Sequence, residues 1–262
     1  MRLGVSSLFA ENLPLFEHLP LLPKNSILDL EIYCYDYPSS LDQAYWEELA
    51  GQVDKNGIQV YSFHTPFFND ISSLDKAVRQ QALRDIEDSL KAANLLQAKF
   101  AIVHPGYFCP PEDKADRVRL SQESLDKIYG FCLKSGIRMA VENMPPRFVG
   151  NGVEGLSEVI KGLPAEAGIC LDAGHSFMGQ TPPQDFVRHF GQRLFTLHLH
   201  DNDGKDDQHL LPGEGKINWA SLMKELQENQ FKGVYMMEIG NYKEPKEILS
   251  QAKKIGDGLF AS

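Results

Sequence analysis

Short apolar segments rich in β-branched residues recur along this chain, and stretches with helical spacing of apolar residues separate them. The clearest helical stretches are Leu74–Ala98, Leu120–Lys134 and Trp219–Asn229. Strands and helices that alternate in this way are typical of a parallel sheet whose strands are linked by helices. We expect eight strands, at about Leu3–Ser7, Ile27–Tyr33, Ile58–Phe63, Phe100–Val103, Arg138–Val141, Gly168–Leu171, Leu194–Leu199 and Val234–Met237.

Eight strands in a chain of 262 residues predict a closed (β/α)₈ TIM barrel that forms one domain over residues 1–262. The alternative architecture is an open, doubly wound sheet. The nucleotide-binding motifs usual in such sheets are absent, because no GxGxxG follows the first strand and no GxxxxGK[ST] occurs. The longest irregular stretch is Asp201–Lys216, and long loops inside compact domains usually carry function.

The net charge of the chain limits the classes of partner that it is expected to bind. Thirty-six acidic against 26 basic residues give a net charge of −10, which disfavours unspecific attraction to nucleic acid without excluding a local basic groove. The basic residues form no dense cluster in the sequence. We expect a small-molecule partner and no membrane association, with nucleic acid disfavoured and a homo-oligomer left open.

The location of the protein is predicted from its cysteines and its N-terminus. Cys34, Cys109, Cys132 and Cys170 form no CxxC pair, which indicates reduced thiols, and Cys170 lies in an apolar run typical of core packing. The N-terminal residues lack the pattern of a signal peptide, and no apolar run approaches the ~20 residues of a membrane helix. These features predict a cytoplasmic protein.

Acidic residues and histidines stand where six consecutive predicted strands end. Barrel enzymes carry their chemistry at the carboxyl ends of the strands. Asp, Glu and His make up about one sixth of the chain, so chance seldom fills six such positions. The six residues are His64, His104, Glu142, Asp172, His198 and Glu238.

These residue types at one mouth point to a bound metal ion. Three converging carboxylates would raise one another's pKa values, and a divalent cation removes that cost. Imidazole and carboxylate together form a mixed nitrogen and oxygen site. Each residue alone could instead be a hydrogen-bonding loop residue, but the six together predict a metal site.

Two local patterns extend this set. Asp172 and His175 form a D-x-x-H motif after a buried strand, and Asp207 and His209 form a D-x-H motif inside the long polar loop. His198 and His200 lie two residues apart, so on a strand they share one face. We favour His198 as a ligand and His200 as its support or as a substrate contact.

Several segments resemble the xylose isomerase-like TIM-barrel superfamily, which includes sugar isomerases, ketose 3-epimerases and endonuclease IV-type nucleases. The resemblance extends from about residue 58 to 240, and the first two predicted strands contribute nothing specific to it. The matching segments are HTPFFN (64–69), HPG (104–106), EN (142–143), CLDAGHSF (170–177), HLHDND (198–203), DQHLLPGEGKINW (207–219) and ME (237–238).

The resemblance implies two alternative metal centres. In the epimerase branch one ion is held by four residues, which fall on Glu142, Asp172, His198 and Glu238. The endonuclease IV branch adds five ligands to build a three-zinc site. The added ligands fall on His64, His104, His175, Asp207 and His209.

Departures from the nuclease pattern favour the isomerase and epimerase members. This chain reads HLHDND where those nucleases resemble HLNDSK, and its Met144–Phe148 replaces their Gly-rich stretch after EN. Its DAGH and HTPF also replace their DTCH and HGPY. The leading hypothesis is a divalent-metal-dependent isomerase or epimerase that acts on a small sugar or sugar phosphate.

The resemblance and the chemistry together assign roles to particular residues. Zn, Mn, Co or Mg, as one to three ions, would polarise a carbonyl, and Glu142 and Glu238 would move the neighbouring proton. Arg147 is a candidate contact for a substrate carboxylate or phosphate, or else a surface residue. The alternatives are a zinc phosphodiesterase that acts on abasic DNA and a metal-binding barrel without catalysis.

Overall fold

The computed structural model describes residues 2–34, 42–68, 70–240 and 242–260. Asn69 of the HTPFFN segment lies outside the described residues, as do residues 1, 261 and 262 of the expected domain. Eight parallel strands form one sheet in the order β7-β6-β5-β4-β3-β2-β1-β8. The strands are β1 (Arg2–Ser6), β2 (Asp29–Tyr33), β3 (Gln59–His64), β4 (Phe100–Val103), β5 (Arg138–Glu142), β6 (Gly168–Asp172), β7 (Leu194–His198) and β8 (Val234–Met237).

The sheet closes into a barrel between β7 and β8. Leu199 and Met237 form a parallel bridge there. The amide of Leu199 donates to the carbonyl oxygen of Met236 at 2.8 Å, and the amide of Glu238 donates to that of Leu199 at 3.2 Å. The predicted (β/α)₈ barrel is therefore confirmed, and the open doubly wound sheet is wrong.

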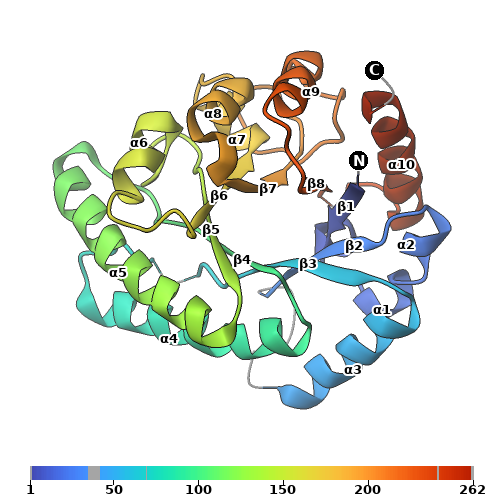
Figure 1. Cartoon of the computed structure of the whole chain (residues 1–262), viewed down its shortest axis with the longest axis horizontal. Helices are drawn as coiled ribbons and strands as arrows, with labels where there is room; N and C mark the ends of the chain where they lie inside the picture. Colours follow the sequence, from blue (N-terminus) through green and yellow to red (C-terminus); the bar gives the residue numbers. More distant parts are fainter. Residues whose placement is uncertain (1, 35–41, 69, 241, 261–262) are drawn as a thin grey trace.

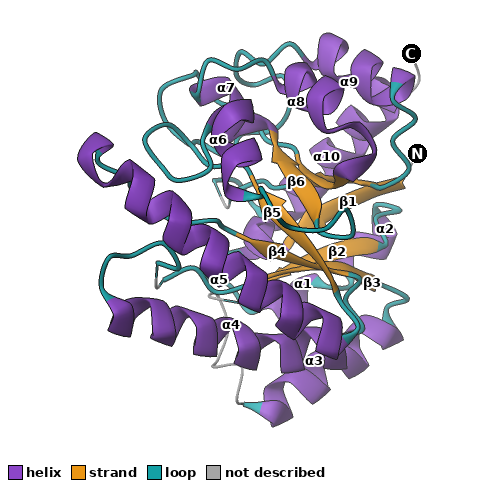
Figure 2. Cartoon of the chain, turned by 60° about the vertical axis from the view of Figure 1, so that its left-hand side comes forward, coloured by secondary structure: helices purple, strands orange, loops and turns teal. Residues whose placement is uncertain are grey.

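Helices surround the strands on the outside (Figures 1 and 2). The described helices are α1 (Leu15–His18), α2 (Leu21–Lys24), α3 (Gln43–Lys55), α4 (Lys76–Leu95), α5 (Lys114–Ser135), α6 (Gly152–Val159), α7 (Ala173–Met178), α8 (Pro183–Phe190), α9 (Trp219–Glu228) and α10 (Pro245–Phe260). None of these helices is both long and apolar enough for a membrane crossing.

Helix α5 begins six residues before the predicted start at Leu120. Its first turns carry mostly charged side chains and only Val118 is buried there, so apolar periodicity does not mark this start. Helices α4 and α9 lie where the periodicity places them. Asp75 caps α4 by accepting from the amide of Ala77 at 2.7 Å, and Asn218 caps α9 by accepting from Ser221 at 3.1 Å.

A small apolar layer fills the inside of the barrel, separate from the larger core between the strands and the helices. Its members alternate along the strands, since side chains two apart on a strand share one face. The layer consists of Tyr61, Phe100, Ile102, Ala140, Cys170, Val234 and Met236. On β4, β5, β6 and β8, the next inward-facing residue beyond this layer therefore reaches the carboxyl-terminal mouth.

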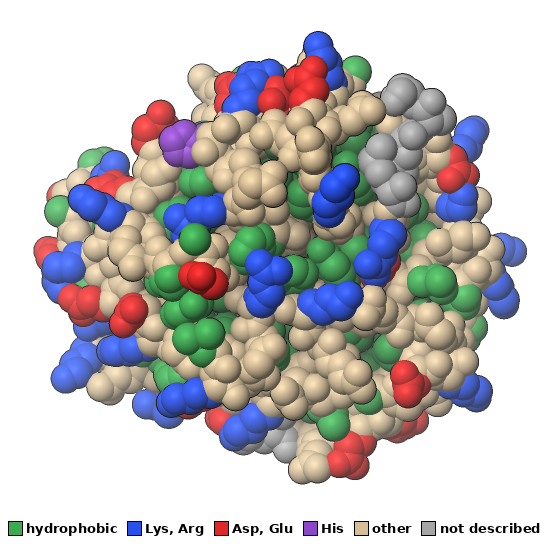
Figure 3. Space-filling model, in the orientation of Figure 1, with side chains coloured by type: hydrophobic (Ala, Val, Ile, Leu, Met, Phe, Trp, Pro, Cys, Tyr) green, Lys and Arg blue, Asp and Glu red, His purple; other side chains and the backbone are tan. Residues whose placement is uncertain are grey.

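The amino-terminal end of the barrel gathers basic residues that are far apart in the sequence. The charged groups of Arg2 and Lys99 each lie 5.9 Å from the ring centroid of Tyr61, and the Arg138 guanidinium lies 3.8 Å from that of Phe195. Lys and Arg side chains also gather near the centre of the face in Figure 3. Arg2, Lys99 and Arg138 come together because parallel strands begin at one end of the barrel.

Candidate metal centre

Alternation along the strands places the candidate ligands at one mouth of the barrel. Four of them stand two residues beyond a member of the inner apolar layer, and each is buried or nearly so. These pairs are Ile102 and His104, Ala140 and Glu142, Cys170 and Asp172, and Met236 and Glu238. The strand-end residues picked from the sequence therefore converge in space.

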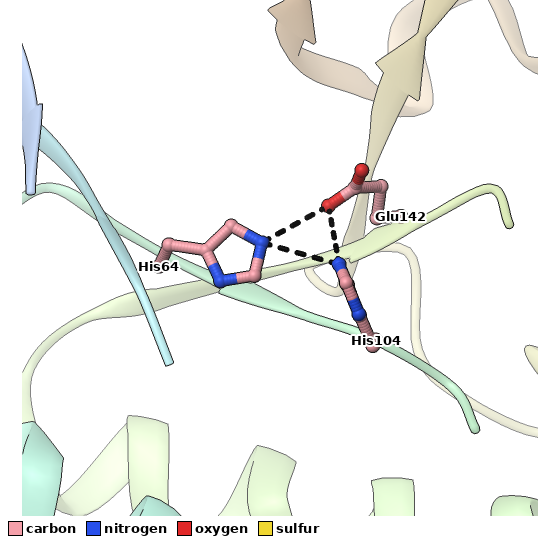
Figure 4. Close-up of side chains that lie close together, drawn as sticks. All are labelled: His64, His104 and Glu142. Atoms are coloured by element: carbon pink, nitrogen blue, oxygen red, sulfur yellow. Dashed lines mark hydrogen bonds and ion pairs between the residues drawn. The ribbon is translucent and has the colours of Figure 1, made fainter. Parts of the chain in front are cut away.

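The first group consists of His64, His104 and Glu142, which point toward one another (Figure 4). The two Nε2 atoms of the histidines lie 3.2 Å apart. Oε2 of Glu142 lies 3.4 Å from Nε2 of His64 and 3.2 Å from Nε2 of His104. Three ligand-type atoms thus face one small volume.

The second group shares Glu142 and adds Asp172, His198 and Glu238, all of them buried. Nδ1 of His198 lies 3.3 Å from Oε1 of Glu142, 3.2 Å from Oε2 of Glu238 and 3.9 Å from Oδ2 of Asp172. Glu142 therefore offers one carboxylate oxygen to each of the first two groups.

The third group lies at the rim, where the long loop folds over the mouth. Oδ2 of Asp207 lies 3.1 Å from Nε2 of His175 and 3.2 Å from Nε2 of His209. His200 also faces this loop, with Nε2 at 3.7 Å from Oδ1 of Asp207. All nine residues that the resemblance implies as ligands are thus brought to one mouth.

The third group depends on one buried carboxylate, Asp201, which fixes the loop 201–216. Its Oδ1 accepts from the amides of Asn202 at 2.9 Å and Ile217 at 3.1 Å. Its Oδ2 accepts from the amide of Gly213 and from Nε1 of Trp219, both at 2.8 Å. Four donors on one carboxylate hold both ends of the loop that carries Asp207 and His209.

Backbone carbonyl groups orient three of the histidines. Nδ1 of His64, His175 and His209 lies 3.0 Å from the carbonyl oxygens of Thr65, Asn143 and Glu238, respectively. An imidazole that donates Nδ1–H to a carbonyl oxygen presents the lone pair of Nε2, which is how metal-binding histidines are commonly fixed.

The separations fit a metal centre. Ligand atoms about 2.0–2.1 Å from a tetrahedral zinc ion lie about 3.3 Å from one another. The first group shows 3.2, 3.2 and 3.4 Å, and the two closest approaches to His198 Nδ1 are 3.2 and 3.3 Å. His198 Nδ1 and Glu238 Oε2 are buried and form no hydrogen bond with any described residue. The donor set suits a divalent ion.

The charged groups of the mouth perturb one another strongly. Burial would raise the pKa of Glu142, but His198 and His104 hold it well below its usual value. Burial, together with the Glu31 carboxylate, raises the pKa of Glu238 well above its usual value. Two acidic side chains that flank one imidazole nitrogen thus differ in proton affinity, as acid and base pairs do in enzymes.

The histidines are perturbed as well. Burial alone would lower the pKa of His175, but Asp172 and Asp207 raise it to about 10. Burial lowers the pKa of His104 despite the nearby Glu142. Protons therefore occupy part of this cluster in the metal-free protein, and a bound cation would have to displace them.

Three further residues singled out from the sequence, His200, Arg147 and Cys170, lie in different surroundings. His200 is buried, with Nε2 at 3.0 Å from Oδ2 of Asp172, so it contacts a candidate ligand directly. Arg147 is exposed on the loop after β5, and its guanidinium lies 4.7 Å from the ring centroid of Phe108. Cys170 is buried in the inner layer as predicted, and its sulfur lies within 4.8 Å of ligand-type atoms of Glu142 and His198.

One residue of the cluster, Glu31 on β2, is not predicted from the sequence. This carboxylate is fully buried and lies 3.0 Å from Nε2 of His198. The expectation that the first two strands contribute nothing specific is thus corrected. The available signal was an acidic residue inside the apolar segment Ile27–Tyr33, but that segment also contains Asp29, and Glu31 stands before the strand end.

Comparisons with known proteins agree with this architecture. The crystal structure of a D-tagatose 3-epimerase-like protein superposes with a TM-score of 0.86 at 26% identity, over 100% of this chain and 97% of that one. The IOLI protein, whose crystal structure holds a zinc atom, gives a TM-score of 0.84 at 19% identity, over 100% of this chain and 97% of that one.

Sequence relatives lead to the same family. The uncharacterized protein MJ1311 of Methanocaldococcus jannaschii is 29% identical over 97% of this chain and 90% of its own length. The family model described as the xylose isomerase-like TIM barrel matches residues 29–257. The chain therefore belongs to the xylose isomerase-like TIM barrel family.

Proposed function

We propose that this protein is a divalent-metal-dependent isomerase or epimerase of a small sugar or sugar phosphate. One observation carries the proposal: the carboxylates of Glu142 and Glu238 flank Nδ1 of His198 at 3.3 and 3.2 Å. Two carboxylates on either side of one candidate ion position can act on a substrate from two directions. Likeness to a D-tagatose 3-epimerase-like structure supports the substrate class.

Glu142, Asp172, His198 and Glu238 would hold the ion, which would polarise a substrate carbonyl and so acidify the neighbouring C–H group. One of the two glutamates takes the proton from that carbon, and the other returns a proton to the opposite face. Both carboxylates are buried, so each is held in a fixed position beside the substrate.

Two residues would contact the substrate at the edge of this centre. Nε2 of His200 lies 3.9 Å from Oε2 of Glu238, which places His200 within reach of a hydroxyl group at that carboxylate. Arg147 is exposed on the loop after β5, where it could bind a substrate phosphate or carboxylate.

Solvent exchange tests this function. The protein, loaded with Mn²⁺, Co²⁺, Zn²⁺ or Mg²⁺ in turn, is incubated in D₂O with a panel of ketopentoses, ketohexoses and their phosphates. We expect one substrate to gain deuterium at the carbon beside the carbonyl and to form an epimer or isomer, as followed by proton NMR. Metal binding without exchange in any substrate would contradict the proposal and favour a barrel without catalysis.

A second candidate function is zinc-dependent phosphodiester cleavage, and the first and third ligand groups specifically favour it. Neither is needed for a four-ligand centre, yet Nε2 of His64 and His104 converge on Oε2 of Glu142, and Asp207 joins His175 to His209. A centre of several ions suits displacement at phosphorus.

A nicking assay separates the two candidates. The assay uses a duplex with one abasic site and protein that holds a measured amount of zinc. We expect no efficient nicking, because the net charge of −10 opposes binding of the duplex. Zinc-dependent nicking that is lost in His175→Ala would replace the isomerase proposal with the nuclease.

A further inference from the structure

Glu31 is a buried carboxylate on β2 with a contact to the candidate metal centre. Its side chain is fully buried, and its two oxygens lie 3.0 and 3.1 Å from Nε2 of His198. Ser62 on the neighbouring strand β3 donates its hydroxyl to Oε2 of Glu31 at 2.5 Å. The carboxylate is therefore held from one side and faces His198 on the other.

His198 is turned the opposite way from the other anchored histidines. His64, His175 and His209 are anchored through Nδ1 by backbone carbonyl oxygens and present Nε2. His198 is anchored through Nε2 by Glu31 and presents Nδ1 to Glu142 and Glu238. Nδ1 forms no hydrogen bond with any described residue, so this atom is available to a ligand.

The position of the Glu31 carboxylate is energetically unfavourable, because it is buried near other carboxylates. Glu31, Glu142, Asp172 and Glu238 are all buried, and His198 contacts or faces each of them. A buried charge is retained at such a position when it has a partner or a function. An uncharged side chain at position 31 would fill the same space and would leave only three buried carboxylates around His198.

We propose that Glu31 is a positioning residue of the metal centre: it keeps the proton of His198 on Nε2 and so directs Nδ1 toward the ion. A carboxylate that accepts from the outer nitrogen of a histidine ligand also raises its basicity, and removal of such a partner typically weakens metal binding by about 10- to 100-fold. The inference rests on the metal centre of the proposed function but not on which reaction that centre performs.

Metal affinity of chelator-stripped protein tests this role, by competition against a chromophoric zinc chelator and by Co²⁺ absorption. We expect Glu31→Met to weaken the tightest zinc site by about 10- to 100-fold. Glu31→Gln keeps an oxygen that can accept from Nε2, so its affinity should lie between Glu31→Met and wild type. Thermal unfolding of the metal-free variants measures the structural cost separately, because Glu31→Met leaves Nε2 of His198 without its buried partner.

Glu225→Gln is the matched control, since Glu225 is a buried carboxylate on α9 that belongs to none of the candidate ligand groups and pairs with Arg188 at 2.5 Å. It should lower the melting temperature and leave zinc affinity unchanged. A Glu31→Met variant that behaves like this control, less stable but with wild-type zinc affinity, would show a merely structural role and overturn the proposal.

A double variant tests whether Glu31 acts through His198. His198→Gln should weaken zinc binding by itself, and Glu31→Met in that background should cost little more. Additive losses of zinc affinity in the double variant would overturn the proposal that Glu31 acts through His198. If the wild type binds no divalent ion at all, both the metal centre and this role are wrong, whereas wild-type zinc binding with no sugar turnover would remove only the proposed function.

Discussion

The imidazole of His200 occupies the space that a side chain at Gly174 would need: a Cβ at position 174 would overlap the ring. Gly174 lies in the short helix α7, and His200 stands just beyond β7 and touches Asp172. Helix and strand can approach this closely only because residue 174 has no side chain.

Gly174→Ala should therefore displace His200 and weaken metal binding at least tenfold for one ion, while circular dichroism stays that of the wild type. Gly130→Ala is the control, because a Cβ at position 130 in α5 meets nothing within 4 Å. That change should shift stability by no more than about 1 kcal/mol, in the stabilising direction. Equal metal content and affinity in both variants would show that His200 has no part in the centre.

Asp201→Asn tests how the loop 201–216 is fixed. Both oxygens of Asp201 accept from two N–H donors each, so an amide NH₂ would face donors in either orientation. We expect a loss of roughly 3 kcal/mol in the free energy of unfolding. The fluorescence of Trp219, which donates to this carboxylate, should shift as well.

The neighbouring Asp206→Asn serves as the control, since Asp206 is exposed on the same loop. Its urea midpoint should match that of the wild type within the error of the titration. If the two variants unfold alike, the buried carboxylate does not hold the loop.

Much of this architecture can be predicted from the sequence, and the reason is geometric. A parallel barrel brings every strand end to one mouth, so residues as distant as His64 and Glu238 can be grouped by their place after an apolar strand alone. Motifs close in sequence, such as Asp207 and His209, extend the group because a two-residue spacing keeps them together.

The remainder depends on contacts that the sequence does not encode locally. Glu31 reaches His198 across the barrel, 167 positions away, and it lies inside its strand rather than at the end. Asp201 resembles any acidic loop residue until four donors are seen around it. Arg2, Lys99 and Arg138 come together only because parallel strands begin at the same end of the barrel.

The metal-free protein should lose stability as the pH rises above neutrality, in part through His175. Its pKa is raised from 6.5 to about 10, so between these values the folded state keeps a proton that the unfolded state has released. One such group lowers the free energy of unfolding by about 1.4 kcal/mol for each pH unit in this window.

Urea unfolding of chelator-treated protein between pH 7 and 10 measures this slope. It should be shallower by about 1.4 kcal/mol per pH unit in His175→Asn. His189→Asn, at an exposed position on α8, serves as the surface control for the same measurement. Identical slopes in wild type and His175→Asn would contradict the raised pKa.

Metal binding should release protons and weaken as the pH falls. Ligand histidines bind only when neutral. Burial alone would lower the pKa of His198, but the neighbouring Cys170, Glu31 and Glu142 raise it well above its usual value, so a cation must displace its proton. Calorimetric titration with Zn²⁺ at pH 8, in two buffers of different ionisation enthalpy, should show at least one proton released for each protein molecule. Affinity that stays constant from pH 8 to 5 would indicate a centre of carboxylates alone.

Glu142→Gln and Glu238→Gln should each reduce sugar turnover by about 10²- to 10⁴-fold, the usual contribution of a general acid or base. Their folds should persist, since residues at the carboxyl-terminal mouth serve function while stability comes from the inner layers and the opposite face. Glu123→Gln on the exposed side of α5 is the control, and it should retain wild-type activity.

The two active-site variants should also differ from each other. If each glutamate serves one face of the substrate, each variant should lose deuterium exchange more severely with one of the two epimers than with the other. The epimer that is more affected should differ between Glu142→Gln and Glu238→Gln. NMR of both epimers in D₂O measures this directly. Full turnover in either variant would remove the two-carboxylate mechanism, and equal loss of exchange from both epimers would show that a single base, or the metal alone, controls proton transfer.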